Sequence, residues 1–152
     1  MAILFRKEVN EMENVKIYLS GAMGSVSFEE QWNWRKGIID EISYNHDCKK
    51  KPSFFNPVQY YNFEEVRYKN QKEVMNFDLN ALRNSDLVIV YFNDPSSLGT
   101  CAELAIAYER RIPIVGIRRG DKELHPWLYE FCDRICDNLK EAANYVADFY
   151  LN

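Results

Sequence analysis

The 152 residues include 47% hydrophobic and 28% charged side chains, a balance expected of one folded domain with a single core. This length excludes two full-sized domains, and the 3 Trp, 9 Phe and 10 Tyr exclude a solvated, disordered chain. A formal net charge of −4 provides no general attraction to nucleic acid polymers or anionic membranes, so we expect small molecules or proteins as partners.

Residues 1–14 mix charged residues and Asn without a sustained period, which predicts an N-terminal extension ahead of a single domain over residues 15–152. The apolar stretch Ala2–Phe5 is too short for the core of a signal peptide or for a membrane span. We therefore expect a cytoplasmic protein that does not contact a membrane.

The four cysteines form no CxxC pair, and a chain of this length does not need disulfides to hold its core. Cys132 and Cys136 have the spacing to share one helix face, but only His46 and His125 are available as nitrogen ligands. We therefore expect reduced thiols in packing roles and no metal site.

The first predicted strand covers residues 15–20, a β-branched and aromatic run that ends at the glycine-bearing loop 21–25. A helix is predicted over 28–42, because apolar residues recur there at helical spacing. These residues are expected to form one buried face: Phe28, Trp32, Ile38, Ile39 and Ile42.

The segment 53–57 predicts a second strand that Pro57 ends, followed by a tyrosine-rich loop over 58–70 that we expect to cover a pocket. A helical period from 71 to 84 predicts the next helix. The almost wholly apolar segment 86–92 then predicts a central strand, because central parallel strands are buried on both faces.

The rest of the chain continues the alternation of helix and strand. Its predicted elements are a turn-rich loop over 93–100, a helix over 102–110, a strand over 112–117, a loop through 125–127, a short strand over 134–136 and a helix over 138–149. This alternation predicts a doubly wound α/β fold of the Rossmann or flavodoxin-like kind, with four or five mainly parallel strands and helices on both faces.

In such a sheet, ligands bind beyond the carboxyl ends of the strands, where the loops 21–25 and 94–100 are expected to lie side by side. Glu103 is predicted in the first turn of the next helix, where the helix dipole favours an anion. This carboxylate is a candidate for chemistry, although acidic residues also occur near helix N-termini for structural reasons.

Two further residues add to this candidate site. Asp78 interrupts an apolar pattern between Phe77 and Leu79, either as part of a solvated face or as a functional carboxyl. Tyr18, in the first strand, is either a core aromatic or a hydroxyl donor to a carboxylate at the strand end.

Three motifs in this order resemble the nucleoside 2-deoxyribosyltransferase family, over about Val15 to Val146. The motifs are Lys16–Gly21, then Asn76–Asn80 ahead of Ser85–Val88, then Gly99–Leu104 with Ala107 following. Asp78 and Glu103 are 25 residues apart, a spacing similar to that of the family.

The resemblance implies cleavage of an N-glycosidic bond by double displacement, with Glu103 as the nucleophile on the anomeric carbon of deoxyribose. A carboxylate suits this role because it forms a glycosyl ester and divides one difficult step into two. Asp78 would hydrogen-bond or protonate the departing base, and Tyr18 would orient the nucleophile. The resemblance implies no metal or organic cofactor, and it implies a homo-oligomer.

Ser97 departs from the transferase pattern, in which an Asp at about this position holds the 5′-hydroxyl of the sugar. Related 2′-deoxynucleoside 5′-monophosphate N-glycosidases carry a Ser there, and a hydroxyl can donate to a phosphate that an Asp would repel. The loop 21–26 lacks the Arg that those hydrolases place near the phosphate, and Ser97 could also simply cap the helix. We expect substrate contacts from Gly21, Met23, Asp94, Ser97 and Gly99.

Three functions remain as hypotheses. The first is transfer of deoxyribose between bases of free nucleosides, and the second is hydrolysis of deoxynucleoside 5′-monophosphates. The third, from another class, is a nucleotide-binding or sensing module without turnover. The joint presence of Tyr18, Asp78 and Glu103 favours an enzyme, because a module that only binds needs no nucleophile.

Overall fold

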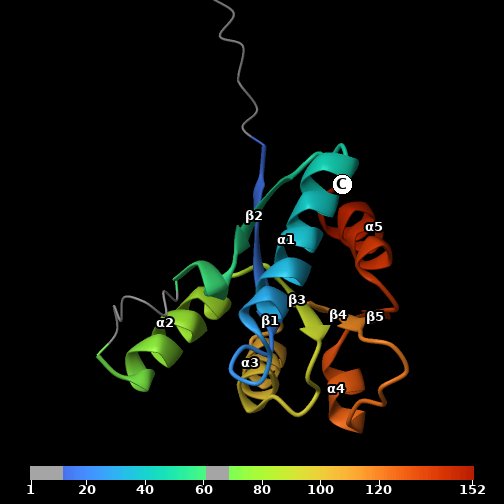
Figure 1. Ribbon diagram of the computed structural model, residues 1–152. Helices are drawn as coiled ribbons and strands as arrows, with labels where there is room; N and C mark the ends of the chain where they lie inside the picture. The colour runs from blue at the N-terminus through green and yellow to red at the C-terminus, as the bar shows by residue number, and fades with distance from the viewer. Residues whose placement is uncertain (1–11, 61–68) are drawn as a thin grey trace, which may run out of the picture.

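A parallel sheet of five strands forms the centre of the protein. The computed structural model describes residues 12–60 and 69–152, in which the strand order is β2-β1-β3-β4-β5 (Figure 1). The strands are β1 (Asn14–Gly21), β2 (Lys51–Phe55), β3 (Leu87–Phe92), β4 (Ile114–Arg118) and β5 (Arg134–Cys136). Every pairing between neighbours is parallel, which confirms the predicted α/β class.

The helices cover both faces of this sheet (Figure 1). On one face, α1 (Phe28–Asn45) packs beside α5 (Leu139–Tyr150). The other face carries α2 (Gln71–Arg83), α3 (Leu98–Glu109) and α4 (Pro126–Phe131). A short 3-10 helix, η1 (Pro57–Tyr60), follows β2.

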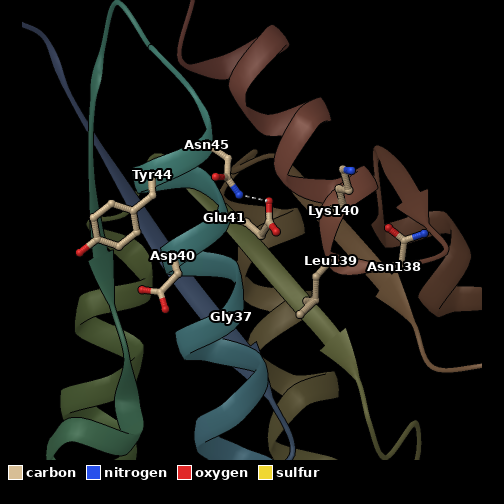
Figure 2. A pocket seen from close by; sticks show the side chains of 8 residues that line it. All are labelled: Gly37, Asp40, Glu41, Tyr44, Asn45, Asn138, Leu139 and Lys140. Carbon is tan, nitrogen blue, oxygen red and sulfur yellow. Dashed lines mark hydrogen bonds between the residues drawn. The ribbon is translucent and has the colours of Figure 1, made fainter.

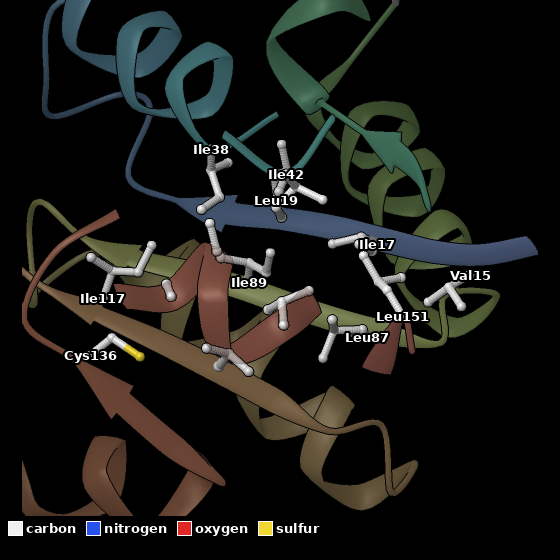
Figure 3. Close-up of a cluster of buried hydrophobic side chains, with 14 of the residues drawn as sticks. Val15, Ile17, Leu19, Ile38, Ile42, Leu87, Ile89, Ile117, Cys136 and Leu151 are labelled. Carbon is white, nitrogen blue, oxygen red and sulfur yellow. The ribbon is translucent and has the colours of Figure 1, made fainter. Parts of the chain in front are cut away.

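The strands send alternate side chains into two separate cores. Under α1 and α5 the buried residues include Ile17, Leu19, Ile38, Leu87 and Ile117 (Figure 3). Under α2, α3 and α4 they include Tyr18, Leu82, Val88, Val90 and Leu104. Because β3 contributes to both cores and is almost wholly buried, its prediction as a central strand is confirmed.

Some predicted boundaries differ from the observed ones, and one short helix was not predicted. β2 ends at Phe55, ahead of Pro57, which instead begins η1. α3 starts at Leu98 and not near residue 102, because the Ser97 hydroxyl accepts a hydrogen bond from the Thr100 N–H and caps the helix. α4 was predicted only as loop, yet His125 caps it and Pro126 stands in its first turn, where proline is well tolerated.

The predicted buried face of α1 is wrong at its N-terminal end. Phe28 is 53% exposed and stacks on Trp32, with 6.2 Å between ring centroids. The buried face consists of Gln31, Trp34, Arg35, Ile38 and Ile42. The buried face is therefore rotated about the helix axis relative to the predicted one. It includes the charged residue Arg35, which a search for apolar periodicity does not detect.

Two predictions fall on residues outside this description: most of the extension over 1–14, and residues 61–68 of the loop over 58–70. Cys132 and Cys136 do not share a helix face, because Cys132 lies just after α4 and Cys136 lies in β5. Within residues 12–60 and 69–152, no helix is both long enough and apolar enough to cross a membrane.

Gly116 in β4 leaves room for two side chains on the α3 and α4 side of the sheet. A Cβ at this position would lie 2.8 Å from Cε2 of Phe92 and 3.1 Å from Sγ of Cys132. We expect Gly116→Ala to reduce the free energy of unfolding by about 1–3 kcal/mol, the usual cost of overpacking a core. Thermal denaturation followed by circular dichroism measures the change.

Gly99→Ala is the control, because a Cβ there would meet no atom within 4 Å. Alanine also favours a helix more than glycine does, so this variant should melt no lower than the wild type. Equal losses in both variants would show that packing at Gly116 is not the cause.

Candidate active site

The candidate site lies at the carboxyl ends of β1 and β3, the two adjacent strands at the centre of the sheet. After β1 the chain enters α1 on one face, and after β3 it enters α3 on the other face. Doubly wound folds bind ligands at such a point, where the connections after two adjacent strands leave the sheet on opposite faces. This position confirms that the loops 21–25 and 94–100 lie side by side.

Asn93 and Asp94 tie these two loops together. The side-chain oxygen of Asn93 accepts a hydrogen bond from the Ala22 N–H at 3.0 Å. Asp94 accepts from the hydroxyls of Ser25 at 2.5 Å and Ser96 at 2.7 Å. These bonds, that from Ser25 foremost, hold the pKa of Asp94 below its usual value. Asp94 is thus an ionised clamp between the loops.

Glu103 lies in the second turn of α3, not in the first as predicted from sequence, because the helix starts earlier. At that depth the helix dipole contributes less, and direct donors matter more. The Ser20 hydroxyl donates to Oε2 of Glu103 at 3.0 Å, and Tyr18 also makes a side-chain hydrogen bond to this carboxyl. Both donors come from β1, so the first strand orients a carboxylate that is far away in sequence.

The pKa of Glu103 is raised to about 7, chiefly because burial disfavours its charged form. The negative charge of Asp78 acts in the same direction. The hydrogen bonds from Ser20 and Tyr18, and the positive charge of Arg35, lower the pKa. Glu103 is therefore poised to exchange its proton near neutral pH, a common property of functional carboxyls.

Asp78 lies on α2, on the same face of the sheet as Glu103, and interacts with it electrostatically. The preceding residue, Phe77, belongs to an aromatic cluster with Tyr18, Phe55 and Tyr60. Phe55 stacks on Tyr18 at 5.3 Å and on Tyr60 at 5.0 Å between ring centroids, and the Phe77 ring meets both Phe55 and Tyr60. Tyr60 and Phe77 remain 41% and 38% exposed, so the cluster offers aromatic surface beside both carboxyls.

The N-terminus of α3 carries two of the predicted substrate-binding residues, Ser97 and Gly99. The Ser97 Oγ accepts hydrogen bonds from the Thr100 N–H at 3.5 Å and the Thr100 hydroxyl at 3.1 Å. Ser97 therefore caps the helix, and its own hydroxyl hydrogen is left to donate elsewhere. Gly99 has open space where a side chain would stand.

The predicted residues Gly21 and Met23 shape the loop after β1. A Cβ at Gly21 would lie 2.8 Å from Cζ2 of Trp34, so glycine allows this tryptophan to pack under the strand end. The Met23 carbonyl accepts a hydrogen bond from the Gln31 side chain at 2.6 Å. Both residues thus have structural roles, and their contact with a substrate stays a prediction.

Sequence reasoning missed Ser20, Arg35 and Arg119. Arg119, directly after β4, pairs with Glu30 of α1 and donates to the Asn93 carbonyl at 3.5 Å, so it places a cation beside the two loops. A polar residue at the end of a strand could have indicated Ser20. An arginine within a buried helical stripe could have indicated Arg35.

A surface groove of about 820 Å³ lies elsewhere, between α1 and the start of α5 (Figure 2). Its lining residues are Gly37, Asp40, Glu41, Tyr44, Asn45, Asn138, Leu139 and Lys140. None of them is a candidate site residue. Within the described parts of the chain, no three His, Cys, Asp or Glu side chains gather as metal ligands.

Residues 14–120 match a family model described as nucleoside 2-deoxyribosyltransferase-like. The chain belongs to this family. The match confirms the resemblance found in the sequence motifs, and it covers Tyr18, Asp78 and Glu103. No protein with a curated description matches the chain.

Solved structures with the same fold include a 2-deoxyribosyltransferase from Bacillus psychrosaccharolyticus, with a TM-score of 0.69 and 15% identity over 86% of this chain and 92% of that one. A conserved protein from Enterococcus faecalis V583 has a TM-score of 0.66 and 16% identity, over 89% and 99% of the two chains. The CMP N-glycosidase BcmB of Clostridium botulinum has a TM-score of 0.58 and 15% identity, over 90% and 99%. At these identities the likeness establishes the fold of this family member.

We expect the carboxyl of Glu103 to titrate with a midpoint near pH 7. NMR of protein labelled with ¹³C in glutamate carboxyls measures this midpoint, and Glu103→Gln assigns the signal. A midpoint below about 5, as in ordinary exposed glutamates, would contradict the observed environment.

The same titration affects stability. The folded-state pKa lies above the usual glutamate pKa of 4.5, so between about pH 4.5 and 7 the folded protein holds a proton that the unfolded chain has lost. The contribution of Glu103 to stability is therefore largest at low pH and decreases as the pH rises through 7. Melting temperatures measured at a series of pH values test this. Glu103→Gln should remove the decrease in stability with rising pH, whereas Glu109→Gln at the end of the same helix should not.

Proposed function

We propose that the protein cleaves the N-glycosidic bond of 2′-deoxyribonucleosides and transfers the deoxyribosyl group to another base. The observation that carries this proposal is the Glu103 carboxyl, which accepts hydrogen bonds from β1 and interacts electrostatically with Asp78. Membership of the nucleoside 2-deoxyribosyltransferase-like family supports the class of reaction.

In the first step, a Glu103 carboxylate oxygen attacks C1′ of the sugar, and the bond from C1′ to the base breaks. The hydrogen bonds from Ser20 and Tyr18 orient the carboxylate for this attack. The product is a glycosyl ester on Glu103, and two successive inversions return the original configuration. In the second step, an incoming base attacks C1′ and releases the carboxylate.

Asp78 is proposed to deliver the proton that the departing base needs and to recover it from the incoming base. The residue before it, Phe77, belongs to a partly exposed aromatic cluster on which a heterocyclic base could stack. Tyr60 and Phe77 are the most accessible rings of this cluster that the structure describes.

Hydrolysis of deoxynucleoside 5′-monophosphates is the second candidate function, with water in place of the incoming base. The supporting observation is the Ser97 hydroxyl, which accepts two hydrogen bonds and keeps its hydrogen for a ligand. Arg119 adds a cation near these loops, which the loop after β1 itself does not supply. The ionised Asp94 adds an opposing negative charge, which favours a neutral 5′-hydroxyl.

Glu103→Gln is expected to reduce base release by at least about 10³-fold, because an amide oxygen is a poor nucleophile. Chromatography of the free base from a panel of deoxynucleosides, with and without a second base, measures the rate. Mass spectrometry of the wild type with a slow substrate should detect a deoxyribosyl adduct on Glu103.

Glu109→Gln, at the far end of α3, is the matched control and should keep full activity. An adduct on another residue, or an active Glu103→Gln variant, would refute the role of Glu103. If the wild type binds deoxynucleotides but releases no base, the protein is a binding module.

Ser97→Asp distinguishes the two candidate substrates. Aspartate caps helices about as well as serine, so the fold should be retained. A new carboxylate about 4 Å from a 5′-phosphate would repel it by about 4 kcal/mol at an effective dielectric constant of about 20. If the enzyme acts on monophosphates, their kcat/KM should decrease far more than that of nucleosides.

Asn138→Asp introduces the same charge at the cap of α5 and should leave the ratio of the two kcat/KM values unchanged. An unchanged ratio in Ser97→Asp as well would show that Ser97 is a helix cap only. The monophosphate candidate would then lose its main support.

A further inference from the structure

Arg35 is a charged side chain with no exposed surface. It lies on α1, in the layer opposite to α3, and packs against the ring of Trp34 at 4.6 Å. In the described parts of the chain, no carboxylate lies within ion-pair distance of it. A buried charge is costly unless polar groups compensate it, so Arg35 must find its hydrogen-bond acceptors inside the protein.

The guanidinium donates three hydrogen bonds, and all three go to backbone carbonyls. Nη1 donates to Gln31 at 2.8 Å, Nη2 to Gly21 at 3.1 Å and Nε to Leu19 at 3.4 Å. The carbonyls of Leu19 and Gly21 belong to the last residues of β1. One rigid guanidinium therefore joins the first half of α1 to the end of the central strand.

β1 needs this support because its neighbour β2 ends early. The pairing with β2 stops where Phe55 stands opposite Tyr18, whereas the pairing with β3 continues to Gly21. Beyond Tyr18, β1 thus has a strand on one side only. Arg35 supplies hydrogen-bond donors to this part of the strand, where a neighbouring backbone is missing.

Ser20 lies between the two anchored carbonyls. Its hydroxyl donates to Glu103 on the other face of the sheet, at 3.0 Å. Fixing the peptide group before Ser20 and the one after Gly21 restricts the direction of the Ser20 side chain. The contact between Ser20 and Glu103 therefore depends on a residue of the opposite helix layer.

We propose that Arg35 is a positioning residue for Glu103: it holds the Leu19–Gly21 segment so that the Ser20 hydroxyl stays on the carboxylate. This inference rests on the proposed nucleophilic role of Glu103. Arg35 makes no hydrogen bond to the carboxylate, and it acts through the strand between them.

The charges around Glu103 are consistent with this arrangement. Tyr18 and Ser20 face it from β1, Asp78 from α2, and Arg35 from α1 behind the strand. Burial lowers the pKa of Arg35 to about 10, against the opposing effect of Glu103, Tyr18 and Asp78. Arg35 therefore remains charged at neutral pH.

Arg35→Lys tests the positioning role because it keeps the charge but removes the fork that reaches both strand carbonyls. We expect the Glu103 carboxyl midpoint, measured by ¹³C NMR, to rise by about one pH unit, the size of one lost charge-assisted hydrogen bond. We also expect kcat for base release to decrease about tenfold, with KM changed less than about twofold. Arg110→Lys, at the far end of α3, is the control for both readouts.

Ser20→Ala should produce the same rise in the Glu103 midpoint. Because Arg35 is inferred to act through Ser20, adding Arg35→Lys to Ser20→Ala should cause no further rise. Additive shifts, or an unchanged midpoint in Arg35→Lys, would overturn the proposal. If Arg35→Lys does not fold, Ser20→Ala alone decides, since an unchanged midpoint there removes the route through Ser20.

The NMR titration needs no substrate, so it separates this inference from the proposed function. A wild type without base release, but with the expected midpoint shifts, would refute the function and keep the link between Arg35 and Glu103. Normal base release by the wild type, with an unchanged Glu103 midpoint in the variants, would keep the proposed function and refute the link between Arg35 and Glu103.

Discussion

The half-burial of one carboxylate is the constraint on which the site depends. A carboxyl group withdrawn from water loses stability in its charged form unless donors reach it. Here the donors to Glu103 come from β1, and the carboxyl itself comes from the helix that follows β3. The two segments can meet only because β1 and β3 are adjacent in the sheet, although β2 and α2 lie between them in the sequence. The strand order is therefore a condition for the proposed chemistry as well as for the fold.

Most of the fold could be predicted from the sequence, because its signals are local. The run 86–92 is apolar enough to indicate a strand buried on both faces, and β3 occupies that place. Boundaries were less predictable wherever a single side chain decides them. α3 begins at Leu98 because the Ser97 hydroxyl caps it, and a serine in a turn-rich loop does not indicate by itself whether it will cap a helix. α4 is too short to show a hydrophobic period, so only its proline and cap could have indicated it.

The candidate site could be predicted only for those residues that belong to recognisable sequence motifs. Tyr18, Asp78 and Glu103 follow from the resemblance to a family, and the structure places Tyr18 and Asp78 as neighbours of Glu103. Ser20 and Arg35 depend on the spatial relation between strands and helices that are separate in sequence, and no spacing rule describes it. The apolar stripe of α1 was placed on the wrong residues because its buried face includes an arginine. The charged residue in the buried face of α1 was thus the most informative signal, and a search for hydrophobic residues alone overlooks it.

The shortness of β2 also affects how readily the edge of the sheet could pair with a strand of another molecule. β2 is an edge strand of five residues, and it opens with Lys51 and Pro52. A proline offers no backbone N–H, and a lysine carries a charge that a second strand would have to cover. β5, at the opposite edge, is only three residues long. Both edges are thus poor templates for adding a foreign strand, which disfavours edge-to-edge aggregation of the folded protein.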